Sequence, residues 1–355
     1  MNSFAVPEKP QATQDPRIQT SEFLSQPYKI NKIYKSMEGP SGSQQIRLLD
    51  TQPPELVWIT KYSVEVVGED GRSPVSQEFM CHNNLDFNPS LHGKTFGWSK
   101  ITTSRLFTLS QGQFTIEFPK GFGIPVLSDE SFFLITQVLN HNIKDIDINV
   151  RHKVSVDFIR ELDLKPGEEI KPLFPASGFV MALMEGKDGF FGLNGEPNEI
   201  QKHANCLPGE HAPNGTITGV YKDNLGRVFS GHWVVKPGRE ERRTLVTKWL
   251  RIPYDTTVHF IAVHVHPFCE SLELRDLNTG KTVFKSYARR PDKGVGLANV
   301  DYFSSQEGIP LYKDHEYEMI SVYDNDSGVN QDSMATFFLY LLDKDFQKPV
   351  QMSYK

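Results

Sequence analysis

The sequence predicts an all-β protein made of two tandem antiparallel β-sandwich domains of jelly-roll-like type. Three observations lead to this fold class. The chain has 355 residues, which exceeds what one small core organises. It contains 26 Gly and 23 Pro, and these interrupt many short runs of Val, Ile, Thr, Phe and Tyr. Such spacing is typical of antiparallel sandwiches, and long helical periodicity is absent from the pattern.

The domains follow from composition along the chain. Residues 1–27 are rich in Pro, Gln, Ser and Thr without periodicity, so we expect a disordered or extended N-terminal arm. Residues 28–165 form the first predicted sandwich, and residues 166–355 form the second. The proline-rich stretch 163–175 marks the crossing between them. The strands expected first in each domain are KIYKSM, SQQIRLLD and ELVWITKYSVEVV, and then GFVMALM, GTITGVYKD and RVFSGHWVV.

Charge and hydropathy exclude several classes of partner. The net charge is −6 with both signs interspersed, so no basic surface for nucleic acid or an anionic membrane is indicated. No run approaches the ~20 apolar residues that cross a bilayer. The N-terminus lacks a secretory pattern, so either the protein is cytosolic or a signal has been removed.

The stretch VHVHPF, residues 263–268, places two imidazoles one residue apart in an otherwise apolar run. Residues i and i+2 of a strand point the same way, so His264 and His266 project from one face. That arrangement suits a single metal ion, and histidine is a common ligand of Cu, Zn, Fe and Ni. The competing interpretation is two ordinary polar residues on a solvated sheet face.

Several segments resemble the copper type II, ascorbate-dependent monooxygenases, the family of peptidylglycine α-hydroxylating monooxygenase and dopamine β-monooxygenase. In that family a His-x-His strand in the second domain is followed by a methionine in a Ser/Asp-rich strand entry. The resemblance extends over roughly residues 28–343. Its motifs here are VHVHPF, NQDSMATFFLYLL, HWVVKPGRE, PKGFG at 119–123 and the dipeptide QV at 137–138.

The resemblance implies a catalytic copper bound by His264, His266 and Met334. Two imidazoles and a thioether form a soft site suited to cycling between Cu(I) and Cu(II), whereas zinc seldom recruits methionine. The alternative for Met334 is a core methionine on an amphipathic strand.

The first domain departs from the family pattern. The family binds a second, electron-relay copper there through an adjacent His-His pair and the His of Gln-Val-His. This chain has only His82 in the first motif and Leu139 in the second, with His141 two residues further on. Either a site is rebuilt from His82 and His141, with Cys81 or His152 assisting, or the relay copper is lost.

Substrate recognition departs as well. The family arginine that grips a substrate carboxylate is replaced by Ala262, and two further family positions carry Thr336 and Phe338. The alanine side chain cannot form the two parallel hydrogen bonds by which a guanidinium binds a carboxylate, so peptide amidation is not expected. We expect a small apolar or aromatic substrate, with Phe268, Phe338 and His232 as candidates to line its pocket.

The resulting hypothesis is a copper-dependent monooxygenase that hydroxylates a C–H bond of a small substrate with dioxygen and an external reductant such as ascorbate. The alternative is a catalytically silent copper-binding or ligand-binding protein on the same scaffold. We expect one copper, export to the periplasm or outside the cell, and an oligomeric state that the sequence leaves open. A zinc loop from His203, Cys206 and His211 is a further, separate possibility.

Overall fold

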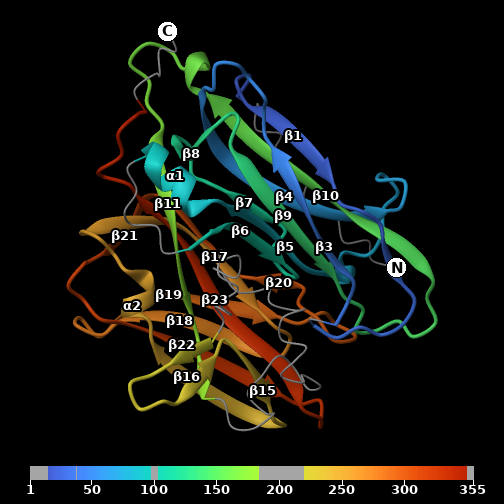
Figure 1. Cartoon of the computed structure of the whole chain (residues 1–355). Coiled ribbons are helices and arrows are strands. Elements are labelled where there is room, and N and C mark those ends of the chain that lie inside the picture. The colour runs from blue at the N-terminus through green and yellow to red at the C-terminus, as the bar shows by residue number, and fades with distance from the viewer. Residues whose placement is uncertain (1–14, 37, 97–102, 184–219, 350–355) are drawn as a thin grey trace, which may run out of the picture.

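A computed structural model describes residues 15–36, 38–96, 103–183 and 220–349. Two antiparallel β-sandwiches follow one another along the chain, which confirms the predicted fold class. Figure 1 shows the strands of the first sandwich, in blue to green, at one end of the molecule and those of the second, in yellow to red, at the other. The boundary between the predicted domains at residue 165 stays a prediction.

The first sandwich contains short strands separated by turns and one short helix. Its strands are β1 (Gln19–Leu24), β2 (Tyr28–Ile30), β3 (Ser41–Arg47), β4 (Leu56–Gly68), β5 (Met80–Phe87), β6 (Arg105–Ser110), β7 (Thr115–Glu117), β8 (Phe122–Leu127), β9 (Ser131–Val138) and β10 (Ile148–Arg160), and its helices are α1 (Pro89–Phe96) and the 3₁₀ turns Gln77–Phe79 and Glu161–Asp163. Strand β1 lies within the segment expected to be an arm, and it pairs antiparallel with β10.

The second sandwich also consists of strands separated by turns, with one short helix. Its strands are β11 (Lys171–Phe179), β12 (Ala182–Leu183), β13 (Val220–Lys222), β14 (Val228–Ser230), β15 (His232–Val235), β16 (Gly238–Leu245), β17 (Thr256–Val265), β18 (Cys269–Asp276), β19 (Lys281–Arg289), β20 (Asn299–Val300), β21 (Phe303–Leu311), β22 (Tyr317–Asn325) and β23 (Gln331–Leu342), with α2 at Thr247–Leu250.

The two sandwiches share one long sheet, which the sequence did not predict. Its strand order is β1-β10-β4-β8-β11-β23-β17-β21. The halves join where β8 and β11 run parallel, at the pairs Phe122 with Lys171 and Gly123 with Pro172. A second sheet, β3-β9-β5-β6, completes the first sandwich, and the sheet β16-β22-β18-β19-β20 completes the second.

Strands β17 and β23 are buried on both faces because they contribute to two cores. Their even-numbered side chains, such as Ala262 and Phe338, pack in the first core. Their odd-numbered side chains, such as Val263 and Phe337, pack in the second core. Successive side chains of a strand point to opposite faces, so β17 and β23 form the wall between the sandwiches. A bulge in β17 lies between Val258, which packs in the second core, and Phe260. Polar residues at even positions therefore face the first sandwich from Phe260 onward in β17 and along β23.

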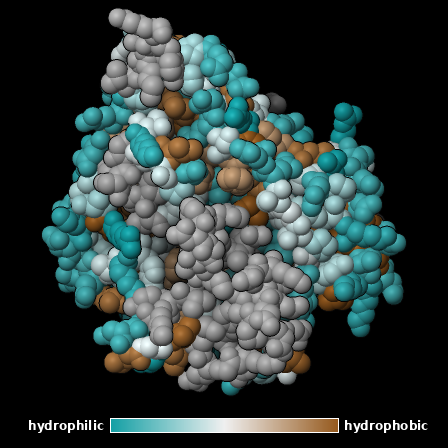
Figure 2. All heavy atoms as spheres, in the orientation of Figure 1, coloured by the Kyte–Doolittle hydropathy of each residue, from teal (hydrophilic) through white to brown (hydrophobic). Residues whose placement is uncertain are grey.

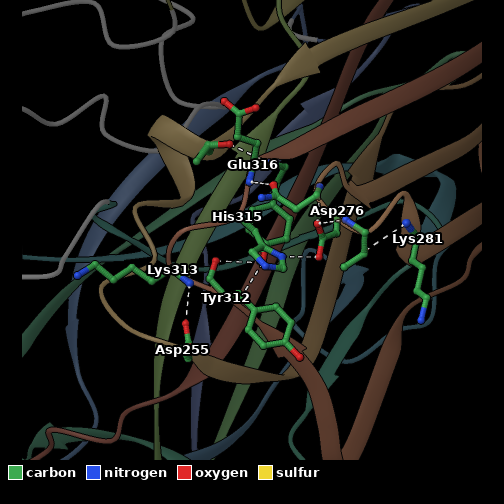
Figure 3. A network of polar contacts seen from close by, with 11 residues as sticks. Asp255, Asp276, Lys281, Tyr312, Lys313, His315 and Glu316 are labelled. Carbon is green, nitrogen blue, oxygen red and sulfur yellow. Dashed lines mark hydrogen bonds and ion pairs between the residues drawn. The ribbon is translucent and has the colours of Figure 1, made fainter.

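Local polar contacts fix the turns at the ends of the strands. In the second sandwich Asp276 accepts hydrogen bonds from two turn amides and faces His315, whose Nδ1 lies 2.8 Å from its Oδ2 (Figure 3). Burial alone would raise the pKa of Asp276, but these hydrogen bonds lower it overall. Asp255 likewise accepts from the backbone nitrogen of Lys313 at 2.9 Å. This cluster holds two turns together.

The described surface is largely hydrophilic on the face seen in Figure 2, with hydrophobic residues in small separate groups. The strand β16 carries Arg and Glu side chains along a sheet edge and is mostly exposed, as expected for an edge strand that resists pairing with other chains. Within the described ranges, no helix is both long enough and apolar enough to cross a membrane.

Candidate functional site

Three strands bring His232, Met334 and His266 into one row. Met334 of β23 is the direct partner of His232 on β15, and its carbonyl oxygen accepts a hydrogen bond of 3.3 Å from the His266 nitrogen, just beyond the end of β17. Directly paired residues of antiparallel strands have side chains on the same face, with Cβ atoms about 4.5–5.5 Å apart. The methionine therefore lies between two imidazoles.

His264 belongs to the next row on the same face. It pairs with Thr336, two residues after Met334. Its ring lies 5.4 Å from that of His266, nearly perpendicular, and the His232 ring lies 6.1 Å from His266. The structure thus brings together the three residues predicted as copper ligands and adds His232, which the sequence suggested for the substrate pocket.

This row faces the first sandwich and is almost completely buried. Met334 and His232 are fully buried, and His264 and His266 are only 3% and 4% exposed. The first sandwich contributes His82 of β5, which is 1% exposed, and His141, which follows β9. Burial lowers the pKa of each, and an electrostatic effect of His266 adds to the lowering. We refer to His82, His141, His232, His264 and His266 as the histidine cluster.

Burial favours the neutral imidazole at His82, His141, His232 and His264. It lowers the pKa of His232 and of His141 to about 4. It also lowers the pKa values of His82 and His264 well below the usual range, and neighbouring histidines lower them further. A neutral imidazole offers a ring-nitrogen lone pair, which is the form that binds a metal ion.

Two side chains hold His266 and Met334 in place. The Asp332 carboxylate lies 3.1 Å from Nδ1 of His266, as a close contact rather than a well-directed hydrogen bond. The hydroxyl of Tyr323 accepts a hydrogen bond from the backbone nitrogen of His266 at 3.3 Å and donates one to the Met334 carbonyl at 2.5 Å. The carboxylate lies beside one ring nitrogen, and Tyr323 connects the segments that carry the imidazole and the thioether.

A cavity of about 10 Å³ borders the histidine cluster on the side of the first sandwich. His264 and His266 form one wall, and Cys81, Leu139 and Leu297 form others. This volume corresponds to about one water-sized site. Leu139, which replaces a histidine of the family pattern, is thus part of the cavity wall.

Neither ring nitrogen of His264 has a hydrogen-bond partner among the described residues. Leaving a buried polar atom without a partner costs about 1–3 kcal/mol. No three His, Cys, Asp or Glu side chains in the described parts of the chain form a group that could hold a metal ion. A three-ligand set at this place therefore depends on the thioether of Met334.

The remaining predicted residues lie elsewhere or outside the description. Phe268 packs in the second core with the Arg290 guanidinium 4.7 Å above its ring. Phe338 packs in the first core, opposite Ala262. The second copper site of His82 and His141, and the pocket roles of the two phenylalanines, stay predictions. The possible zinc loop at residues 203–211 lies outside the described residues.

A buried ion pair next to the cluster was not foreseen from the sequence. Arg105 of β6 is fully buried and its guanidinium bonds to Asp86 of β5. The charge of Arg105 contributes to the lowered pKa values of His82 and His264. The signal that could have revealed the pair is the run Asn83 to Asp86 in a strand whose residues are otherwise apolar.

The comparisons with known proteins return structural matches only. No family model matches the chain, and neither does any curated protein. N-glycanase F (PNGase F) matches with 8% identity and a TM-score of 0.35, covering 92% of this chain and 96% of that one. PNGase F, a glycosylasparaginase from Flavobacterium meningosepticum, matches with 8% identity and a TM-score of 0.36, over 94% and 99%. PNGF-II matches with 9% identity and a TM-score of 0.32, over 91% and 65%.

These findings correct the sequence analysis. The structural similarity is to N-glycanases, and no family or curated match supports the copper monooxygenases, so the predicted membership is wrong. The predicted function, copper-dependent hydroxylation with dioxygen, is wrong with it, and the alternative of a silent copper- or ligand-binding member of that scaffold loses its support. Similarity this weak assigns no N-glycanase activity to the chain either.

Proposed function

We propose that the protein binds one soft transition-metal ion between its two sandwiches, with His264, His266 and Met334 as ligands. The observation that supports this most directly is the strand register around Met334. It places Met334 between His232 and His266 on a single sheet face, and His264 follows in the next row with its ring 5.4 Å from that of His266. The proposal rests on this geometry and not on family membership.

The chemistry of the donor set selects the kind of ion. Thioether sulfur binds soft ions, imidazole binds several transition metals, and hard ions such as Mg²⁺ and Ca²⁺ prefer oxygen ligands. The Asp332 carboxylate beside Nδ1 of His266 resembles the carboxylate partners that orient metal-bound imidazoles. Contact at Nδ1 leaves Nε2 as the nitrogen directed to an ion.

Ordinary core packing is the competing explanation, and it accounts poorly for His264. Its two ring nitrogens are buried without partners among the described residues, whereas Val or Ile would fill the strand position without that penalty. His152 differs from His264 in one ring nitrogen: it is fully buried and its Nε2 also lacks a partner among the described residues, but its Nδ1 lies 3.2 Å from the Asn83 amide nitrogen.

We propose metal binding and no catalysed reaction. Copper as the particular ion, an external reductant and a small-molecule partner stay predictions, and no oxygen chemistry is proposed. Export from the cytosol belongs to the same proposal, because soft-metal sites that retain copper commonly belong to proteins outside the cytosol. Cell fractionation tests that part directly.

Metal titration of the full chain tests the proposal. The protein is stripped with a chelator, incubated separately with copper(I), copper(II) and zinc, desalted, and analysed for retained metal. We expect about one equivalent of a soft ion, and weaker binding in Met334→Leu and His266→Ala. The variant Asp332→Asn should bind on the order of 10- to 100-fold more weakly, as carboxylate partners of ligating histidines do.

Two matched controls separate ligation from packing. Met319 is also fully buried in the second core, and His152 is a buried histidine away from the row, so Met319→Leu and His152→Gln should bind as the wild type does. The proposal fails if no ion is retained, or if Met319→Leu weakens binding as much as Met334→Leu.

A further inference from the structure

The loop between β19 and β20, residues 290–298, leaves the second sandwich, contacts the first and returns, and it closes one side of the cavity beside the histidine cluster. We call it the strap. Leu297 of the strap lines the cavity with His264, His266 and Cys81. Leu297 is nearly buried, whereas Asp292 and Lys293 earlier in the strap are exposed. The strap therefore has one surface in solvent and one residue in the cavity wall.

Side chains of the first sandwich hold the strap down. Asn142 makes two hydrogen bonds to Val295, accepting from its nitrogen at 2.8 Å and donating to its oxygen at 3.0 Å. Gln111 accepts from the Leu297 nitrogen at 3.2 Å. Glu78 accepts from the Asn142 amide at 2.9 Å and so orients it. These contacts depend on two amide side chains rather than on a strand ladder.

The rest of the strap is consistent with a hinged segment. At its start, the guanidinium of Arg290 bonds to Asp326 at 2.7 Å and to the Asp324 carbonyl, both in the second sandwich. Gly294 has a φ of 82°, and a Cβ there would lie 2.6 Å from the Asn142 Oδ1. Only glycine accepts this conformation and this close approach without strain. The strap is thus anchored at Arg290 and latched at Val295 and Leu297.

We propose that the strap is a gate that controls entry to the cavity, with Asn142 and Gln111 as its latch. The inference rests on the proposed function, because the gate would admit the metal ion that the cluster binds. A segment held by a few side-chain hydrogen bonds opens locally at a much lower free energy than strands of a core. Releasing the latch exposes the cavity without separating the sandwiches.

Thiol labelling measures the opening without any metal. Cys81 lines the cavity, and Cys269 is buried in the second core as an internal reference. In a Cys206→Ser background, the rate at which a small thiol reagent modifies each cysteine is followed by mass spectrometry. Asn142→Ala should raise the Cys81 rate on the order of tenfold, because two hydrogen bonds of the latch are lost. Gly294→Ala should have the same effect by straining the strap.

The matched control removes an amide side chain at the opposite end of β19. Asn278 accepts a hydrogen bond of 2.8 Å from the Glu316 nitrogen, and Asn278→Ala should leave the Cys81 rate unchanged. Unchanged Cys81 labelling in both Asn142→Ala and Gly294→Ala overturns the gate. An equal rise for Cys81 and Cys269 overturns it too, because that result reports global loosening.

Metal uptake provides the second readout. Asn142→Ala should take up the ion that the wild type retains more quickly, with the same final content, since Asn142 is not among the three proposed ligands. A wild type that retains no metal defeats the proposed function but leaves the labelling result standing. Slower or equal uptake together with faster labelling overturns the link between the strap and metal entry.

Discussion

The buried histidines make stability depend on pH, and His152 allows this effect to be isolated. Its side chain is fully buried between β10 and its neighbours, and burial lowers its pKa from 6.5 to about 3. The Asn83 amide nitrogen lies 3.2 Å from Nδ1, and the same amide accepts from Tyr62 through its oxygen. A proton on Nδ1 would therefore face a donor.

The sign and size of the effect follow from proton uptake. Below about pH 6.5 the unfolded chain protonates this histidine while the folded chain does not, so acid favours the unfolded state. The contribution of His152 is fully present above its unfolded pKa and is lost as the pH falls toward its folded pKa. Between about pH 7 and about pH 5.5 the loss for one such group is about 1.3 kcal/mol.

Urea unfolding of metal-free protein at the two pH values is the assay. The variant His152→Gln keeps a partner for Asn83 but cannot titrate. The wild type should lose about 1.3 kcal/mol more stability than the variant over this interval. Other buried histidines, such as His232, add to the total in both proteins and cancel in the comparison. An identical loss in wild type and variant would refute the assignment of a neutral, buried His152.

Three further predictions concern the residues around the cluster. Removing one partner of the buried pair, as in Asp86→Ala, should lower the free energy of unfolding by about 3–5 kcal/mol, and adding Arg105→Met should recover much of that loss in the same urea assay. Tyr323→Phe should cost about 1–2 kcal/mol and should also change the absorption spectrum of bound copper(II), which a loss of packing alone leaves unaltered. His264→Val should stabilise the metal-free protein by about 1–2 kcal/mol and should abolish metal binding at the proposed site of His264, His266 and Met334. A lower stability of His264→Val would contradict the account of its unpartnered nitrogens.

The sequence predicts most strands and the local arrangement of the site because both depend on short-range geometry. The expected strand KIYKSM is an exception, since its described residues 32–36 form only an isolated bridge at Tyr34. Alternation of side chains along a strand places His264 and His266 on one face from the sequence alone. The helix at residues 89–96 was missed, although Pro89 follows Asn88, whose Oδ1 accepts from the nitrogens of Ser90 and Leu91. This cap followed by proline is a recognisable start signal.

The family membership was wrong for a physical reason. Motifs such as His-x-His, a proline-glycine turn and a strand with a methionine each report the geometry of one strand or turn. Antiparallel sandwiches repeat strands and turns in similar order, so a correct order of weak motifs can arise in unrelated sequences. Hydroxylation was then inferred from the family resemblance alone, although no residue in the chain requires that reaction.

The shared sheet could not be read from the sequence, since pairing between β8 and β11 involves residues about 50 positions apart. The same is true of His82 and His141, whose approach to His266 depends on how the sandwiches pack. Alternation shows that the even positions of β17 share a face, but it cannot say whether that face meets solvent or a second core. The competing interpretation, two polar residues on a solvated sheet face, is wrong because this packing leaves His264 and His266 only 3% and 4% exposed.

Burial of β17 on both faces ties the histidine cluster to the integrity of the whole molecule. Its odd positions, such as Val263, hold the second core together, while Ala262 two residues before His264 packs into the first core. Separating the sandwiches would expose that apolar face together with the imidazoles, at a free energy close to that of global unfolding. An ion therefore cannot reach His266 by parting the domains under native conditions. A local opening avoids that cost: release of the strap, tethered by Asn142 and Gln111, exposes Leu297 of the second core but leaves the strands of both cores in place.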